Sequence, residues 1–143
     1  MHATPYLESG SIGALALRNR LVRAATGETM ASVTGAVTDD HVRLYDDLAR
    51  GGAGLIVTGH IYVEPRGQYA PFQLGLYADE LVAGFRRITD VVHAAGGVIF
   101  AELAHAGSQT LMPDIDPVAP SVVPNAIYAR RPREMTAADI ATV

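Results

Sequence analysis

Two stretches of this sequence share one pattern, in which a helix-like segment runs into a Gly-Gly pair and then into a short apolar strand. The first covers 49–60, with its strand at 55–58, and the second covers 93–107, with its strand at 98–103. A glycine pair ends a helix because glycine accepts the left-handed conformation, and a strand that is apolar on both faces is covered by helices. Two such units in series predict a parallel α/β sheet, in which the chemistry sits at the carboxyl ends of the strands.

The rest of the chain extends this pattern to an order of β-α-β-α-β-α. The further expected elements are a hairpin or irregular lead-in over 1–20, a strand over 21–26, a helix from Thr38 to Gly51, a loop over 61–76, a helix over 79–95, a long loop with Pro113, Pro117, Pro120 and Pro124, and a helix opened by a capping box at Thr136 and Asp139. Right-handed crossovers make the three strands parallel. Such a sheet has two open edges, so we expect part of a larger barrel.

Composition and charge exclude several classes of protein. The 143 residues are 49% hydrophobic and 18% charged, which is enough apolar material for a core in one domain or part of one. The net charge of −4 argues against a nucleic-acid surface. We interpret the basic cluster at 130–133 as a solvated loop, because it lacks interleaved aromatic residues.

The sequence contains no cysteine, which excludes disulfides, thiolate catalysis and zinc–thiolate sites. We expect no metal site. The first residues show no signal-peptide pattern, and no apolar run approaches the ~20 residues that cross a bilayer. We therefore expect a cytoplasmic protein without a membrane or nucleic-acid partner.

Several motifs, in this order and spacing, resemble those of one known family. They are Asn-Arg-Leu-Val-Arg-Ala-Ala-Thr at 19–26, Gly-Ala-Val-Thr-Asp at 35–39, Tyr-Asp-Asp-Leu-Ala at 45–49, Leu-Gly-Leu-Tyr at 74–77, Leu-Ala-His-Ala-Gly at 103–107, Ala-Pro-Ser at 119–121 and Arg-Glu-Met-Thr at 133–136. Together they resemble the N-terminal part of the old yellow enzyme family of NADH:flavin oxidoreductases, closest to its 2,4-dienoyl-CoA reductase branch. The resemblance implies an eight-stranded (β/α) barrel with FMN at the strand carboxyl ends. Because such a barrel takes roughly 250 residues or more, residues 1–143 would form about three of its strands, preceded by a short hairpin.

The resemblance also implies an activity. FMN would be reduced by NAD(P)H and would pass a hydride to an activated C=C bond of a small molecule, in a possible homo-oligomer. The substrate-binding His pair, the proton donor and the phosphate-binding loops of the family follow later strands, so catalytic residues are expected beyond Val143 and not within this chain.

The resemblance places the end of the first strand along the flavin. Ala24, Ala25, Thr26 and Gly27 are small, and a planar ring can approach the backbone of such residues closely. The alternative is that these residues form only a tight strand-to-loop turn.

Three further residues are expected at the flavin edge. Gly59 and His60 close the second strand, with contact mainly through the backbone of His60, and Glu102 stands where relatives have Gln. A carboxylate accepts a hydrogen bond from the ring N3–H but donates none. An anionic Glu102 would lower the reduction potential of the flavin, whereas burial would favour the protonated acid and restore a donor.

Thr29 and His105 are the expected substrate-side residues. His105 has a second interpretation, in which it packs and hydrogen-bonds within its loop. Glu28 is either an acid beside the ring or a solvated loop carboxylate, and Asn19 and Arg20 precede the first strand, where residues stabilise a barrel.

Two other functions stay open from the sequence. The chain could be a truncated, non-catalytic partial barrel that acts as a structural or interaction fragment, or part of a phosphate-metabolising barrel without flavin. The glycines at 51–54 precede a strand and not a helix, so they are no dinucleotide fingerprint.

Overall fold

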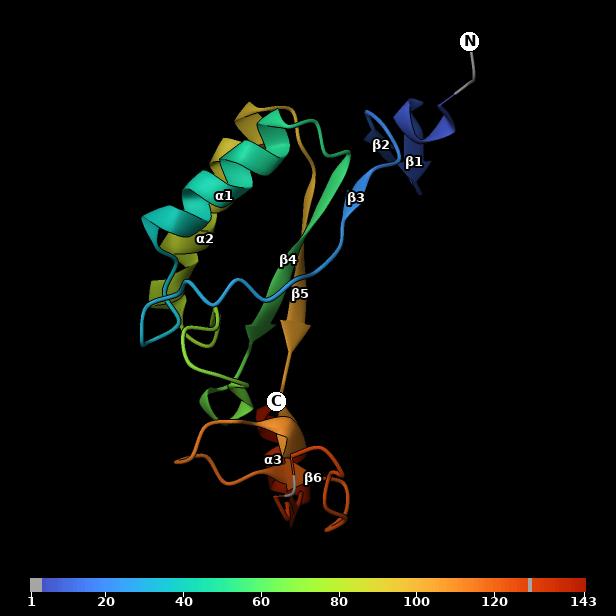
Figure 1. Ribbon diagram of the computed structural model, residues 1–143. Coiled ribbons are helices and arrows are strands. Elements are labelled where there is room, and N and C mark those ends of the chain that lie inside the picture. The colour runs from blue at the N-terminus through green and yellow to red at the C-terminus, as the bar shows by residue number, and fades with distance from the viewer. Residues whose placement is uncertain (1–3, 129) are drawn as a thin grey trace.

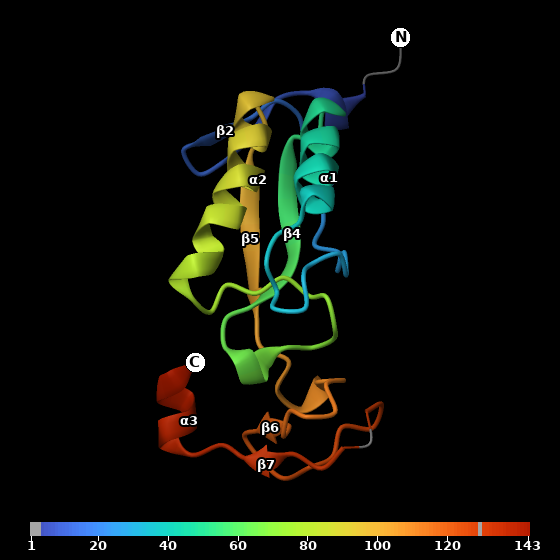
Figure 2. The same cartoon turned by 90° about the vertical axis from the view of Figure 1, so that its left-hand side faces the viewer.

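The computed structural model describes residues 4–128 and 130–143, and a three-stranded parallel sheet of order β3–β4–β5 forms its centre. The strands are β3 (Val22–Arg23), β4 (Leu55–Tyr62) and β5 (Ile99–Ala104). Helices α1 (Asp39–Arg50) and α2 (Val82–Ala94) lie side by side over one face of the sheet (Figure 1, Figure 2). This arrangement confirms the predicted parallel α/β order.

The core lies between the two helices and the sheet. Its fully buried members come from α1, β4 and α2 and are Tyr45, Ala49, Ile56, Ile88 and Val92. The helical members are four residues apart, so they lie on one helix face. Burying a side chain such as Ile56 or Ile88 stabilises the fold by about 1.5–3 kcal/mol.

The predicted glycine pairs end both helices. Gly52 follows α1 with a φ of +92°, and Gly96 follows α2 with a φ of +69°. The predicted start of the last helix is also observed. Thr136 and Asp139 form the expected capping box at the beginning of α3 (Ala137–Thr142). The predicted second helix begins with a 3-10 turn over Asp79–Leu81 before α2.

The first two strands differ in length from the prediction. The first was expected over 21–26, but β3 ends at Arg23, whose guanidinium hydrogen-bonds the carbonyl oxygens of Ala24 and Val57 where the ladder would continue. β4 continues to Tyr62, four residues beyond the predicted end at Thr58, through a register shift between Val57 and His60.

Two small sheets lie at opposite ends of the central strands (Figure 1). The hairpin of β1 (Gly10–Ile12) and β2 (Leu15–Leu17) lies at the amino ends, and the parallel pair β6 (Val118–Ala119) and β7 (Arg133–Glu134) lies with α3 at the carboxyl ends. Arg18 fixes the hairpin by donating to the carbonyl oxygens of Ala49, Ala53 and Ala95.

Arginines anchor the long loop before α3. Within the basic cluster at residues 130–133, Arg131 and Arg133 are exposed, as expected for a solvated loop, whereas Arg130 is half-buried. Arg130 donates to the carbonyl oxygens of Met112 and Ile115 at 2.8 and 2.7 Å, and Arg133 pairs with Asp139. These contacts shape the loop that borders the carboxyl ends of the strands.

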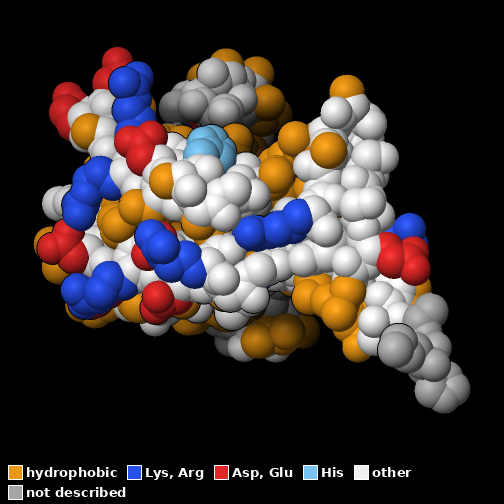
Figure 3. Space-filling model, turned by 90° about the horizontal axis from the view of Figure 1, so that it is seen from above, with side chains coloured by type: hydrophobic (Ala, Val, Ile, Leu, Met, Phe, Trp, Pro, Cys, Tyr) orange, Lys and Arg blue, Asp and Glu red, His pale blue; other side chains and the backbone are white. Residues whose placement is uncertain are grey.

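The molecular surface carries charges of both signs, interspersed with apolar side chains, in the view onto the end where the hairpin lies (Figure 3). The sheet face opposite the helices exposes apolar side chains that include Val22 and Phe100. None of the helices in the described ranges is long and apolar enough to cross a membrane.

Candidate functional site

Two adjoining cavities open at the carboxyl ends of the central strands. They have volumes of about 170 and 360 Å³, and both are lined by His60, Tyr69 and Gln73. The larger falls in the range of small-molecule pockets. The smaller is completed by Gly27, Glu28, Thr29, Ala70 and Leu74, and the larger by Ala104, His105, Ala106, Gln109 and Tyr128.

His60 and Glu102, both expected at the flavin, are neighbours in the sheet. They are register partners on β4 and β5, so their side chains leave the same face. The Glu102 side chain is exposed, and its backbone N–H donates to the Thr58 hydroxyl at 3.1 Å.

The segment at residues 24–27 runs beside the second half of β4. A Cβ on Gly59 would lie 2.6 Å from the carbonyl oxygen of Thr26, and a Cβ on Gly27 would lie 3.2 Å from Cε1 of His60. Ala24, Thr26 and Gly27 are exposed, and Ala25 is half-buried. The small side chains of residues 24–27 and the backbone of Gly59 form an accessible edge that a flat ring can approach. The residues present therefore fit a flavin.

Gln73 engages His60 at two atoms. Its amide nitrogen lies 3.3 Å from Nδ1 of His60 and donates to the His60 carbonyl oxygen at 3.2 Å. The Tyr69 ring is tilted against the imidazole, with 5.6 Å between the ring centroids. The carbonyl oxygen of His60 thus has a protein partner, and the imidazole lines both cavities, while the expected backbone contact of His60 with flavin stays a prediction.

Both ring nitrogens of His105 bond within the protein. Nδ1 accepts from the Gly107 N–H at 3.0 Å, so in the neutral ring Nε2 carries the proton and donates to Glu64 at 3.1 Å. Burial alone would raise the pKa of Glu64, but hydrogen bonds from Arg66 and His105 outweigh it and lower that pKa. His105 therefore has the packing and hydrogen-bonding role that the sequence also allowed, and its contact with substrate stays a prediction.

Thr29 borders the smaller cavity in an unusual conformation. Its φ is +52°, which is the left-handed region, and its hydroxyl donates to the carbonyl oxygen of Glu28. A non-glycine residue held there costs of order 1–3 kcal/mol, and such residues cluster at ligand sites. Its predicted contact with substrate remains a prediction.

Glu28 is not a solvated loop carboxylate. Its side chain is 5% exposed and accepts hydrogen bonds from Tyr45, Gly59 and Arg23. Sequence reasoning missed this role, together with Tyr69 and Gln73. The signal available for these two was their position in a Pro- and Gly-rich loop directly after a strand.

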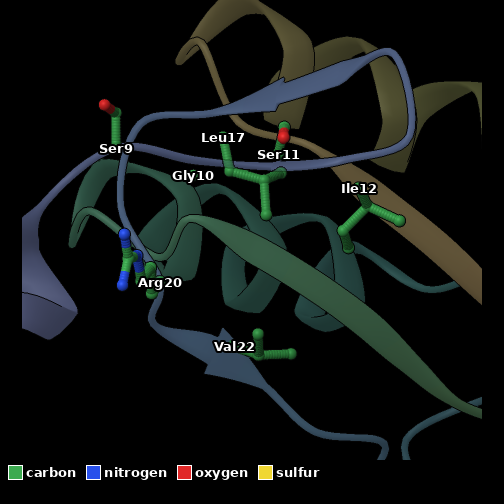
Figure 4. Close-up of a pocket in the computed structure, with 7 residues that line it drawn as sticks. All are labelled: Ser9, Gly10, Ser11, Ile12, Leu17, Arg20 and Val22. Carbon is green, nitrogen blue, oxygen red and sulfur yellow. The ribbon is translucent and has the colours of Figure 1, made fainter.

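A larger hollow of about 490 Å³ lies at the amino end, between the hairpin and β3 (Figure 4). Among the residues that the structure describes, Arg20 is the only charged one in its lining, and it pairs at the surface with Glu8. The nearby Asn19 side chain bonds the Gly52 carbonyl and the Leu21 N–H, which is a structural role. With no acid–base pair, this hollow is a weaker candidate than the carboxyl end. No group of three or more metal-ligating side chains is found in residues 4–128 and 130–143.

A protein family and several known proteins match this chain in sequence. The sequence model of the NADH:flavin oxidoreductase / NADH oxidase family matches residues 10–143. The chain is 36% identical to an NADH oxidase of Thermoanaerobacter brockii over 97% of its own length and 22% of the relative's. It is 38% identical to a 4,4'-dithiodibutanoate disulfide reductase of Rhodococcus erythropolis over 80% of its own length and 28% of the relative's.

Solved structures share the fold. A 2-naphthoyl-CoA reductase superposes with a TM-score of 0.89 at 23% identity, over 96% of this chain and 23% of that one. An old yellow enzyme homologue from Zymomonas mobilis superposes with a TM-score of 0.80 at 26% identity, over 95% and 41%. The described sheet and helices thus correspond to part of an old-yellow-enzyme-type barrel, and the chain spans about a quarter of the two curated relatives' length. The chain belongs to the NADH:flavin oxidoreductase / NADH oxidase family.

Proposed function

We propose that residues 1–143 supply part of the FMN site of an ene-reductase-type oxidoreductase. The observation that carries the proposal is the gathering of the expected flavin-side residues at one edge, where Gly27 packs on His60 and His60 is the register partner of Glu102. When bound, FMN supplies the hydride chemistry, with NAD(P)H as reductant and an activated C=C bond as acceptor.

The residues of this chain would bind and orient the flavin ring. The backbone of residues 24–27 and of Gly59 would hold the ring edge, and Glu102 would accept a hydrogen bond from the ring N3–H. His60 would contact the edge mainly through its backbone, with its imidazole beside the ring. Thr29 and His105 border the cavities on the substrate side.

The alternative is a non-catalytic partial barrel that acts as a structural or interaction fragment. The exposed apolar side chains on the open face of the sheet, Val22 and Phe100 among them, favour it. The flavin-free, phosphate-metabolising barrel has no comparable support, since the matching family is one of flavin oxidoreductases.

A spectroscopic experiment tests the proposal. FMN is titrated into the purified chain, and bound flavin is followed by its visible spectrum. NADH or NADPH is then added without oxygen, followed by 2-cyclohexenone. We expect weak FMN binding, because the phosphate-binding loops of the family follow later strands, and we expect the absorbance of bound flavin to bleach with the nicotinamide and to recover with the enone. Colourless protein that associates as its concentration rises would instead support the fragment alternative.

A further inference from the structure

Glu28 joins three elements directly behind the proposed flavin edge. Its Oε1 accepts from Oη of Tyr45 on α1 at 2.8 Å, from the N–H of Gly59 on β4 at 3.2 Å, and from Arg23 at the end of β3 at 3.3 Å. A buried carboxylate is costly unless it is paired and hydrogen-bonded, and Glu28 is both. The loop after β3 is therefore fastened to β4 and α1 through one side chain.

The partners of Glu28 are suited to donate. Burial raises the pKa of Tyr45, and the charge of Glu28 and its hydrogen bond raise it further, so the phenol keeps its proton. Arg23 is mostly buried beside the carboxylate and supplies the opposite charge. The Gly59 N–H is shared between Glu28 and Oη of Tyr45, which lies 3.2 Å away.

The carboxylate also occupies space that only a glycine leaves free. A Cβ on Gly59 would lie 2.2 Å from Oε2 of Glu28, so the acid packs against the bare backbone of β4. Glu28 follows Gly27 and precedes Thr29, whose φ is positive, and all three residues line the smaller cavity. The Glu28 side chain thus fixes the backbone of residues 27–29 against Gly59 of β4, next to the proposed ring edge.

We propose that Glu28 is a positioning residue for the flavin, which holds the backbone of Thr26, Gly27 and Gly59 in the arrangement that binds the ring. This inference rests on the proposed function. It assigns Glu28 no contact with the reacting atoms, because its hydrogen bonds all point to protein groups.

The test compares Glu28→Ala, Glu28→Gln and Tyr45→Phe with the unmodified chain. FMN is titrated against each protein, and the dissociation constant and the visible spectrum of bound flavin are recorded, with circular dichroism as a check of folding. Glu80→Ala is the control, since Glu80 is an exposed acid in the turn before α2.

We expect Glu28→Ala to weaken FMN binding about tenfold, which is the effect of about 1.4 kcal/mol, and to move the spectrum of bound flavin toward that of free FMN. Glu28→Gln keeps an acceptor oxygen for Tyr45 and Gly59, so it should recover most of the affinity and the native spectrum. Tyr45→Phe removes one donor with little change in volume and should shift both readouts in the same direction as Glu28→Ala. Glu80→Ala should change neither.

A folded Glu28→Ala protein with native FMN affinity and spectrum would overturn the inference and leave the proposed function intact. If Glu28→Ala does not fold, native behaviour of Tyr45→Phe would overturn it. An unmodified chain that binds no FMN would overturn the proposed function and this inference with it.

Discussion

At position 59 the backbone has no room for a side chain. A Cβ there would meet both Oε2 of Glu28 and the carbonyl oxygen of Thr26. The sequence allowed us to expect Gly59, His60 and Glu102 at one edge, because they follow or end neighbouring strands. It could not place Glu28, whose partners Tyr45 and Gly59 are 17 and 31 positions away, since no local pattern records such contacts.

We therefore predict that Gly59→Ala destabilises the protein by about 1–3 kcal/mol, because the added methyl group overpacks the site. Gly10→Ala is the matched control. Its Cβ would meet only the flexible Arg20 side chain, at 3.4 Å, so Gly10→Ala should change the free energy of unfolding by no more than about 0.5 kcal/mol. Urea unfolding of the unmodified chain and the two variants measures this free energy. Equal stability of Gly59→Ala and the unmodified chain would refute the packing described at this edge.

Glu102→Gln tests the charge at the same edge. In the proposed site the Glu102 carboxylate would disfavour the electron density that the flavin gains on reduction, so its removal should raise the midpoint potential of bound flavin. An interaction of about 1 kcal/mol corresponds to about 20 mV for a two-electron couple. A potentiometric titration with reference dyes measures the shift. An unchanged or lower potential would contradict an anionic Glu102 beside the ring.

Among the elements, the central strands and the helices were predictable and the β6–β7 pair was not. Glycine pairs and helical periodicity are local signals, whereas β6 and β7 have two residues each, and Arg130 on the intervening loop bonds the segment that precedes β6. Helix α3 depends on one residue in particular. Asp139 accepts from Arg133, from the Thr136 backbone and hydroxyl, and from Arg66 in the loop after β4.

These contacts predict how the docking of α3 depends on pH. The Arg133 guanidinium, then Thr136 and Arg66, hold the pKa of Asp139 well below its usual range. Because the folded-state pKa is lower than the unfolded one, the stabilisation is present above a pH of about 4 and is lost as the pH falls below it. The protection factors of the amides of residues 137–142, which compare their exchange with that of an unstructured chain at the same pH, should fall as the pH is lowered from about 5 to about 3. Asp139→Asn should exchange faster at the upper pH and show a flatter dependence, and identical profiles for the two proteins would refute this role.

For the whole molecule, the helices cover one face of the sheet and leave the other open. Family membership explains the fold as part of a barrel, but no sequence pattern predicted which apolar residues stay exposed. Leu103 on β5 is 61% exposed, and within the described residues no strand pairs with the far edge of β5. An exposed apolar edge strand is a site for association.

The chain should therefore associate as its concentration rises, and Leu103→Lys should reduce this association because an edge lysine opposes pairing. Val33→Lys is the control, since Val33 is 79% exposed on the loop before α1 and lies on no strand. Analytical ultracentrifugation over a concentration series gives the result. Equal association of the two variants would place the contact elsewhere.

The central claim is that flavin binds at the carboxyl ends of β3, β4 and β5. The most direct measurement is a titration of the isotope-labelled chain with FMN, followed through the backbone amide resonances. The largest shifts should fall on residues 24–27, on Gly59 and His60, and on Glu102. Shifts concentrated around the larger hollow lined from residues 9–22 (Figure 4), or no shifts at all, would contradict flavin binding at the carboxyl ends.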